Sequence, residues 1–351
     1  MKINLHSRTA LCLLIFSVQY FALTAQDIHF TNFGFSPLNV NPALTGVFPG
    51  DIRGNASYKQ QWGTFSELVS YTTFSGSVDF KLGNKIANFN HWRGGLIFNY
   101  DQAGWSRLQN MSFSLAGAYM LPLTKKDFVS AGASFGFNQR SFKTQDLTWD
   151  DQYVERVYDP TVTSKDNGAF DGSVNYPTLN LGINYHRALG SSRDPSLQRG
   201  ALDFGIGAFQ INKPTVNFRS GTHISSDPRY STSLSTNLPI GDKFDLLLDG
   251  IYQIQGPNKE LVGGIGGRFY LINKETELFA LQVGVNIRSA DAYSPHIGVL
   301  YNQWRVSLNF DANYSQFTNA SNGLGGPEIH VMYIFKRVRP ANYCPLCPTS
   351  L

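Results

Sequence analysis

Beyond its N-terminus the sequence has no long apolar run. No stretch there approaches the roughly 20 residues that a membrane-spanning helix requires, and the mean hydropathy is −0.20. Charged residues are also scarce, at 15 % of the chain, where a typical soluble chain carries about 25 %. The first absence excludes spanning helices, and the second argues against a surface that is exposed to water on all sides.

Cysteine is rare, with three residues in 351. Cys12 lies at the start of an apolar run with no hydrophobic stretch before it, which argues against a lipidated cysteine. Cys344 and Cys347 form a single CxxC pair in the tail. Without a second pair or a nearby histidine they do not complete the four ligands of a structural zinc site. We expect a local feature of the tail, either a disulfide or a docking turn, with a metal or redox role as the alternative.

Strong charge of one sign is missing as well. The first 25 residues have the pattern of a signal peptide: Lys2 and Arg8, then the apolar "LCLLIFSVQYFAL", then a small residue at a cut after Ala25. The exported chain from Gln26 onward keeps 27 basic and 25 acidic residues. This balance gives no electrostatic case for binding nucleic acid.

What the sequence does contain is a series of segments that alternate apolar and polar residues, the period of a β-strand. In one of them Val306, Leu308 and Phe310 alternate with Ser307 and Asn309. Turn-forming residues separate the segments. The series predicts fourteen strands, at about residues 52–61, 67–82, 92–101, 109–121, 127–140, 175–187, 200–211, 229–238, 243–254, 261–271, 277–288, 293–302, 304–314 and 326–337.

Alternation alone fits either a soluble β-sandwich or a barrel in lipid, but three observations favour lipid. Many segments run about ten residues, the length of a tilted membrane strand, where strands in soluble sheets usually have five or six. Their number is even, and the longest odd-numbered connections exceed most even-numbered ones, as expected of long outer loops and short periplasmic turns. Trp62, Trp92, Trp105 and Trp304 fall at strand ends, where interfacial girdles lie. We therefore predict an all-β outer-membrane β-barrel of about fourteen antiparallel strands.

This prediction divides the chain into four parts. Residues 1–25 are the signal peptide, and residues 51–337 form the barrel. Residues 26–50 are too apolar and too rich in proline and glycine for a free arm, so we expect them to pack against the barrel or plug it. Residues 338–351 form a periplasmic tail. In the closing strand we expect Ile329, Val331, Tyr333 and Phe335 to face lipid.

Motifs that could carry chemistry are weak. "GASFG" (132–136) matches a nucleophile elbow, but that motif needs a strand, a turn and a helix, and Ser134 falls in mid-strand. "GGIGGRF" (263–269) also lies within a strand, where its glycines would serve curvature or a close approach by the plug. His186 and His330 fall on inward faces, where a hydrogen bond in the lumen is the ordinary role. We expect no enzyme, no cofactor and no metal site.

Two features leave alternatives open. The connection at 141–174 is acidic and could bind calcium or an extracellular partner, although it lacks the ligand spacing of a defined calcium loop; a solvated loop is the simpler interpretation. The inward residues Arg288, Arg305 and Asp311 could set the selectivity of an open lumen, in which case the protein would be a porin or a specific transporter.

Both ends of the exported chain resemble the PorP/SprF family, outer-membrane proteins of the type IX secretion and gliding machinery of Bacteroidota. The resemblance lies in Gln26-Asp27, Phe30 and Phe33, "SPLNVNPALTG" (36–46), "YKQQW" (58–62), "GPEIHVMYIF" (326–335) and "ANYCP" (341–345). The chain departs from the family pattern in its "LCPTSL" ending and in "TFSELVSYTT" after Trp62.

The resemblance implies a non-enzymatic barrel that helps to export or anchor a cell-surface adhesin. It also implies a periplasmic partner, such as a peptidoglycan-binding lipoprotein or another secretion component, besides the lipid of the outer membrane. The residues implied for the partner or plug motif are Pro37, Asn41, Pro42, Gly46 and Trp62. Those implied for docking by the tail are Arg337, Arg339, Tyr343, Cys344 and Cys347.

Overall fold

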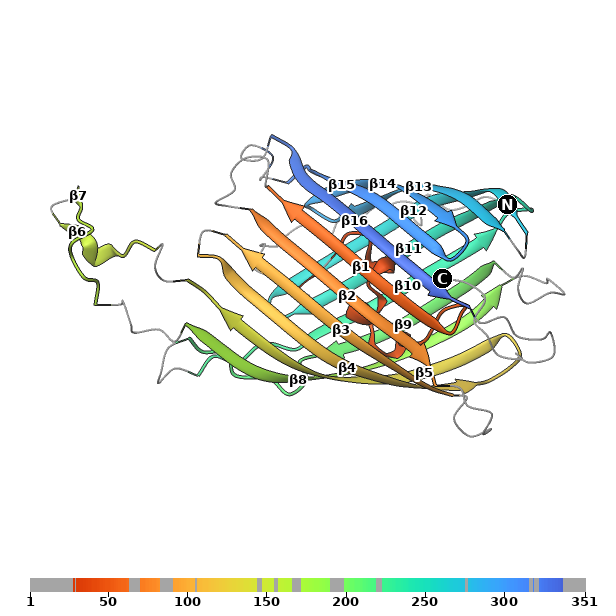
Figure 1. Ribbon diagram of the computed structural model, residues 1–351, viewed down its shortest axis with the longest axis horizontal. Coiled ribbons are helices and arrows are strands. Elements are labelled where there is room, and N and C mark those ends of the chain that lie inside the picture. The colour runs from red at the N-terminus through yellow and green to blue at the C-terminus, as the bar shows by residue number, and fades with distance from the viewer. Residues whose placement is uncertain are drawn as a thin grey trace, which may run out of the picture.

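The computed structural model describes residues 28, 30–62, 70–82, 91–104, 106–143, 147–154, 157–165, 172–189, 199–218, 223–274, 277–315, 318 and 322–336. Fourteen strands of this part of the chain close into one antiparallel barrel (Figure 1). They are β1 (Ile52–Gln61), β2 (Tyr71–Lys81), β3 (Trp92–Ala103), β4 (Leu108–Pro122), β5 (Asp127–Ser141), β8 (Ser173–Leu189), β9 (Gly200–Phe209), β10 (Arg229–Pro239), β11 (Phe244–Gln255), β12 (Asn258–Asn273), β13 (Leu278–Arg288), β14 (Ala292–Tyr301), β15 (Trp304–Asn313) and β16 (Leu324–Phe335).

Each of the fourteen predicted segments forms one of these strands, so the predicted fold is confirmed. No helix among the described residues is long and apolar enough to cross a membrane. The chain order is also the order around the wall, with β5 next to β8. The intervening β6 (Tyr153–Val154) and β7 (Val157–Tyr158) pair only with each other, in a small separate sheet that the alternation did not predict.

The barrel closes between its first and last strands. β1 and β16 pair from Ile52 opposite Phe335 to Lys59 opposite Glu328. Because side chains alternate across a strand, Ile329 and Phe335 face outward and are 43 % and 41 % exposed, while Glu328 is fully buried on the inner face. The outward face of the whole wall is apolar, with Leu115, Phe135, Ile183, Ile265, Leu271 and Ile297 all more than half exposed. Such a face belongs in lipid.

Tryptophans mark the two rims of the wall. Trp62 follows β1 directly, and Trp92 and Trp304 begin β3 and β15. Each contacts a tyrosine ring of a neighbouring strand: Trp62 with Tyr71, Trp92 with Tyr119 and Trp304 with Tyr333, at ring-centroid distances of 4.7–5.1 Å. Trp105, which was also predicted at a strand end, lies outside the described residues. Aromatic rims of this kind fit the interfacial girdles of a membrane barrel.

The two ends of the barrel differ. One end carries the start of β1, the end of β16 and short turns such as 123–126, 240–243 and 302–303. The same end also carries the connections 82–91 and 190–199. The opposite end carries the two longest connections, 142–172 and 210–228, and the first of these bears β6 and β7 and projects well past the barrel strands in Figure 1. We assign the end with short turns to the periplasm and the other to the outside, as in other outer-membrane barrels.

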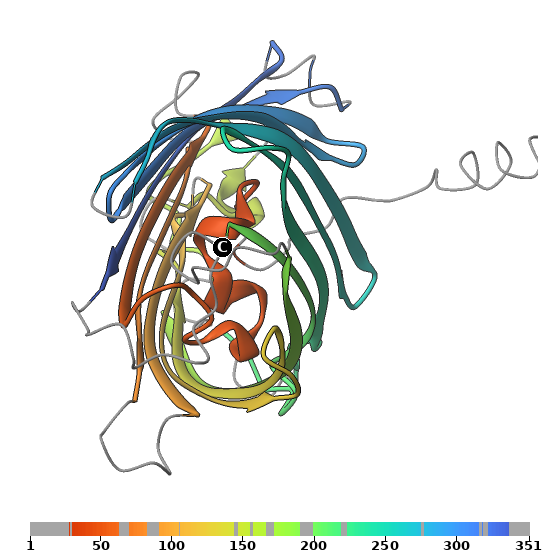
Figure 2. The same ribbon diagram turned by 90° about the vertical axis from the view of Figure 1, so that its right-hand side faces the viewer.

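Residues 30–50, hereafter the plug, run inside the barrel (Figure 2). They form η1 (Phe33–Phe35), α2 (Pro37–Val40) and η2 (Pro42–Leu44). Pro37 and Pro42 each occupy the first position of a helical turn, where a missing N–H costs nothing. Such short turns cannot be stable alone, so the plug depends on its contacts with the wall.

The plug is held partly by apolar packing. Phe33, Val40, Leu44 and Val47 pack with wall residues such as Phe128. Leu38 packs with Ile97 and Ala116, and Phe48 with Met332 and Ile334. Burying each large side chain contributes on the order of 1.5–3 kcal/mol. The inner face of the wall is therefore not uniformly polar, because it turns apolar where the plug rests on it.

Candidate functional site: the plug and its anchors in the wall

The motif residues of the plug make specific contacts with the wall. The Asn41 side chain is fully buried: its Oδ1 accepts a hydrogen bond from Ala43 N at 2.9 Å, which caps η2, and its Nδ2 donates to Ile183 O of β8 at 2.9 Å. Gly46 has φ +72°, a conformation that favours glycine, and its N–H donates to Asp79 Oδ2 at 2.7 Å. These residues thus shape the plug and attach it.

A buried ion pair forms the first anchor. Arg53 of β1 and Asp79 of β2 are cross-strand partners on the inner face, and their side chains are 0 % exposed. The Arg53 Nη2 and Nε groups donate to the two Asp79 carboxylate oxygens at 2.7 and 2.9 Å. The guanidinium also donates to Val47 O and Leu44 O of the plug. Asp79 also accepts from Gly46 N, so this bidentate pair joins two wall strands to Leu44, Gly46 and Val47 of the plug.

A larger charged cluster forms the second anchor. Lys59 Nζ of β1 contacts Glu328 of β16 at 2.7 Å and Asp311 of β15 at 3.0 Å, and Arg288 Nη2 of β13 donates to Asp311 at 3.1 Å. All four side chains are 5 % exposed or less. Two buried cations thus face two buried anions, and Arg288 also pairs with the partly exposed Asp291, so that each charge has an opposite partner.

The start of the plug completes this cluster. Thr31 N donates to Glu328 Oε1 at 3.1 Å, and Thr31 Oγ1 accepts from Arg288 Nη1 at 2.9 Å and donates to Asp311 Oδ2 at 3.2 Å. His330 contacts Ser57 Oγ and Glu328 Oε2 and stacks on Phe35 of the plug at 5.2 Å. Arg288 and Asp311, predicted as selectivity residues of a lumen, therefore bind each other and the plug.

Further polar bonds tie the middle of the plug to several strands. Ser130 Oγ of β5 donates to Ala43 O at 2.7 Å, and Lys81 Nζ of β2 donates to Phe48 O at 2.7 Å. The Asn39 side chain donates to Ser75 Oγ and Asn99 Oδ1. Backbone carbonyls of the plug that would otherwise be buried without a partner are satisfied by wall side chains. Short turns can therefore persist in the lumen without a sheet of their own.

Glycines in the wall allow the plug to approach closely. A side chain added at Gly132, Gly182, Gly205 or Gly207 would meet plug atoms from Val40 to Ala43. The glycines of "GGIGGRF" have a different environment. A Cβ added at most of these glycines would approach residues of β11, β12 or β13 and not of the plug, such as Asn286 near Gly264 and Val283 O near Gly266. The predicted close approach by the plug thus occurs at glycines of β5, β8 and β9 rather than in this motif.

Gly132→Ala should therefore loosen the plug. Its Cβ would lie 2.5 Å from Pro42 O and 2.6 Å from Ala43 Cα, which are backbone atoms that cannot rotate away. We expect the free energy of unfolding to fall by about 1–3 kcal/mol, the usual cost of overpacking, as measured by guanidinium titration of the barrel in detergent. The matched control is Gly263→Ala, also within a strand, where nothing lies within 4 Å. Equal stability of the two variants would contradict this account of the plug contact.

The remaining candidates from the sequence are scattered. Ser134 lies within β5 and its Oγ accepts from Asn180 Nδ2 at 2.9 Å, so it is not on a strand-turn-helix elbow. His186 Nδ1 contacts Asp203 Oδ1 at 2.9 Å. Arg305 lies on the inner face of β15, opposite Met332 in register. No group of three or more His, Cys, Asp or Glu side chains in the described part of the chain could hold a metal ion. Arg337, Arg339, Tyr343, Cys344 and Cys347 lie outside the described residues.

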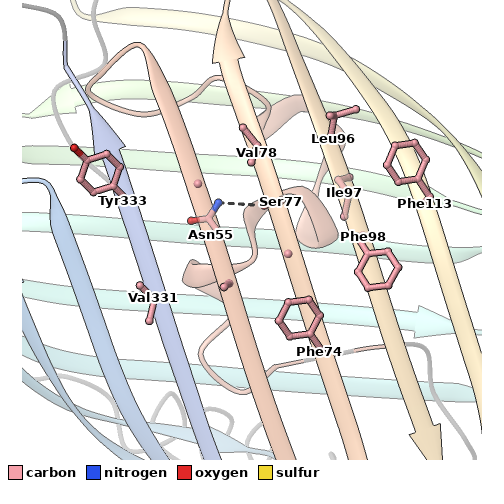
Figure 3. A pocket seen from close by; sticks show the side chains of 13 residues that line it. Asn55, Phe74, Ser77, Val78, Leu96, Ile97, Phe98, Phe113, Val331 and Tyr333 are labelled. Atoms are coloured by element: carbon pink, nitrogen blue, oxygen red, sulfur yellow. Dashed lines mark hydrogen bonds between the residues drawn. The ribbon is translucent and has the colours of Figure 1, made fainter.

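A hollow of about 460 Å³ lies on the outer face of the wall, over β1 to β4 and β16 (Figure 3). It exists because Gly54 and Gly76 have no side chain and Ala56 has only a methyl group between the rings of Phe74, Phe98 and Tyr333. Asn55 and Ser77 beneath it bond to each other at 3.2 Å and are buried on the inner face. The hollow presents almost only apolar atoms and offers no group for chemistry.

Comparison with known proteins decides the family. The sequence profile described as type IX secretion system membrane protein PorP/SprF matches residues 22–332. The chain belongs to the PorP/SprF family. It is thus a membrane protein of the type IX secretion system, and its lipid-facing fourteen-stranded barrel places it in the outer membrane. No curated protein matches the chain.

Solved structures with a similar outline are distant in sequence. The toluene transporter TbuX of Ralstonia pickettii is 10 % identical, with a TM-score of 0.48 over 86 % of this chain and 93 % of its own. The monoaromatic hydrocarbon channel CymD is 10 % identical, with a TM-score of 0.47 over 87 % of this chain and 94 % of its own. The Pseudomonas putida toluene transporter TodX is 10 % identical, with a TM-score of 0.43 over 85 % and 93 %.

Sequence reasoning identified the plug but missed most of its anchors. Arg53, Lys59, Asp79 and Glu328 did not stand out, since each is a single charge within an alternating segment. A usable signal was present: charged residues at inward positions of adjacent strands are costly unless they are paired. The pairing itself becomes visible only with the register, which sets Arg53 opposite Asp79 and Lys59 opposite Glu328.

Proposed function

We propose that the protein is a plugged, non-enzymatic barrel of the type IX secretion machinery that helps to export or anchor a cell-surface adhesin at its outer end. At its periplasmic end it docks a partner, such as a peptidoglycan-binding lipoprotein, through the tail. The observation that carries this proposal is the fixed plug, because a lumen occupied by a segment bonded to the wall suits a scaffold better than a diffusion pore. Family membership supplies the setting.

The plug argues against the alternative of a porin or specific transporter. An open pore would use Arg288 and Asp311 to face passing solutes, but both side chains are 5 % exposed or less and bind Thr31 of the plug. Removing the plug would uncover four buried charges at this cluster and two at the Arg53–Asp79 pair. Its removal would break the hydrogen bonds of Thr31 to Glu328, Asp311 and Arg288. It would also expose the apolar side chains of the plug and of the wall beneath it to water, which is costly. A resting barrel would therefore stay closed.

The docking part of the proposal is tested with the tail. Cross-linked full-length protein, isolated from native outer membrane, should retain a periplasmic partner that is lost when the chain is truncated after Arg339. A matched variant that replaces 340–351 by glycine and serine, at the same length, separates the tail's sequence from its presence. Substituting Cys344 and Cys347 by serine shows whether the two thiols contribute to docking of the partner. Equal recovery of the partner with and without the tail would refute docking by this segment.

A further inference from the structure

The small sheet of β6 and β7 gathers four exposed apolar side chains outside the barrel wall. Tyr153, Val154, Val157 and Tyr158 are 53 %, 50 %, 68 % and 40 % exposed. Apolar side chains of comparable exposure on the barrel wall face lipid, but this hairpin projects beyond the outer end of the strands (Figure 1). In water, clustered exposed apolar side chains mark interaction sites.

Both faces of the hairpin are apolar. Tyr153 pairs with Tyr158, with ring centroids 5.6 Å apart, and Val154 pairs with Val157. Since successive side chains point to opposite faces of a strand, the tyrosines lie on one face and the valines on the other. β6 and β7 pair with no other strand in the described part of the chain, so each leaves an edge free for a further strand.

Polar residues of the connection itself hold the hairpin. Trp149 N donates to Gln152 Oε1 at 3.0 Å, and Gln152 Nε2 donates to Val162 O at 2.9 Å. Asp151 Oδ2 accepts from Lys165 N at 2.8 Å, and Asp159 Oδ1 accepts from the N–H and hydroxyl of Thr161. A two-stranded hairpin is at best marginal in water, and these bonds give it a defined shape. We call residues 149–165 the hairpin module.

The charge of the module selects the kind of partner. Its sequence holds Asp150, Asp151, Glu155 and Asp159 against Arg156 and Lys165, a net charge of −2. The backbone N–H of Lys165 holds the pKa of Asp151 below its usual range, and the Thr161 hydroxyl does the same for the pKa of Asp159. Both carboxylates therefore remain ionised at neutral pH and attract cations.

The chemistry favours a polypeptide over a surface glycan. The Asp151 and Asp159 carboxylates are already engaged by the module's own donors, which leaves them poorly placed to bind sugar hydroxyls. The tyrosine rings of one face can stack on a sugar, but the valine side chains of the other face have no ring for such stacking. A β-strand, in contrast, can bond to a free edge and lay alternate side chains on either face.

We propose that the hairpin module binds an extended, cationic polypeptide segment of an exported surface protein by strand addition. This deepens the proposed function, on which its biological role rests, by naming the surface and the chemistry of the client.

The direct test uses purified full-length protein in detergent and a fluorescent eight-residue peptide of alternating lysine and valine. Replacing Tyr153, Val154, Val157 and Tyr158 by serine should weaken binding about tenfold or more, because these are the contact side chains. Asp150→Asn with Asp159→Asn should weaken it several-fold, since the amide oxygen introduced at position 159 can still accept from Thr161 while the charge is lost. Ile224→Ser, 59 % exposed on another outer loop, is the matched control and should bind as the wild type does.

Other outcomes overturn the inference. These are no binding to the wild type, equal binding to all variants, or equal binding of a peptide with glutamate in place of lysine. Binding of purified lipopolysaccharide oligosaccharide that depends on these residues, without peptide binding, would assign the module to a glycan instead. Unchanged heat-modifiable migration of each variant confirms that its barrel is folded.

A cell experiment separates this inference from the proposed function. Surface biotinylation compares exported proteins in cells that lack the gene, carry the fourfold serine variant, or carry Ile224→Ser. Loss of the same exported protein in the deletion strain and in the fourfold serine strain, but not in the Ile224→Ser strain, supports both proposals. Loss only in the deletion strain overturns the role of the module and leaves the proposed function standing. No loss in the deletion strain refutes the proposed function, whereas peptide binding by the purified full-length protein would be unaffected.

Discussion

Replacing Asp79 by asparagine is expected to lower the free energy of unfolding of the barrel by about 3–5 kcal/mol, the usual cost of leaving a buried charge without its partner. The substitution preserves shape and leaves the Arg53 guanidinium fully buried beside a neutral amide. The same guanidinium holds Leu44 O and Val47 O, so the plug should loosen together with the wall. Guanidinium titration in detergent, followed by heat-modifiable migration, measures the loss.

The control for this prediction is an ion pair that is open to water. Arg187 Nε lies 3.7 Å from Asp127 Oδ1, and the Arg187 side chain is 56 % exposed. Arg187→Gln should cost less than about 1 kcal/mol, because solvent screens such pairs. If Asp79→Asn lowered the free energy of unfolding as little as Arg187→Gln does, the Arg53–Asp79 pair would not be an anchor.

Replacing residues 30–48 by a flexible glycine and serine linker of equal length is expected to turn a silent barrel into an ohmic pore. The wall of fourteen strands is wider than an eight-stranded barrel, which side chains alone can fill. Without the plug, its apolar packing and its bonds to Asp79, Glu328 and Asp311 are lost. Single-channel recording in a planar bilayer detects the change.

Two controls keep this result interpretable. The fourfold serine variant of the hairpin module alters an equally apolar segment outside the lumen and should remain silent. Heat-modifiable migration must show that the linker variant is folded. A folded barrel that lacks the plug and still does not conduct would mean that wall side chains, not residues 30–48, close the lumen.

The barrel could be predicted from the sequence because lipid imposes a strict rule on every strand. Each crossing needs about ten residues with an apolar outer face, so the period of two appears fourteen times and turn residues separate the repeats. The start of the plug was also readable, since Pro37, Asn41 and Pro42 interrupt a segment too apolar to be free in solution. These are local patterns, and local patterns survive in a linear sequence.

The anchors could not be predicted because they depend on register. Glu328 meets Lys59 and Thr31 only after β16 pairs with β1, across a separation of nearly 300 residues. Inward apolar residues such as Met332 and Ile334 were a hint, since they break the polar inner face where Phe48 of the plug packs. The hairpin module was missed for another reason: strands of two residues are too short to show a period.

Planar-bilayer recording of the purified wild-type protein tests the central claim, a closed and plugged barrel, most directly. The account predicts no steady conductance across a range of voltages and salts, while the linker variant conducts under the same conditions. Steady ohmic conductance of the wild type, with an ion selectivity that changes in Arg288→Gln, would contradict the account and identify an open pore lined by that residue.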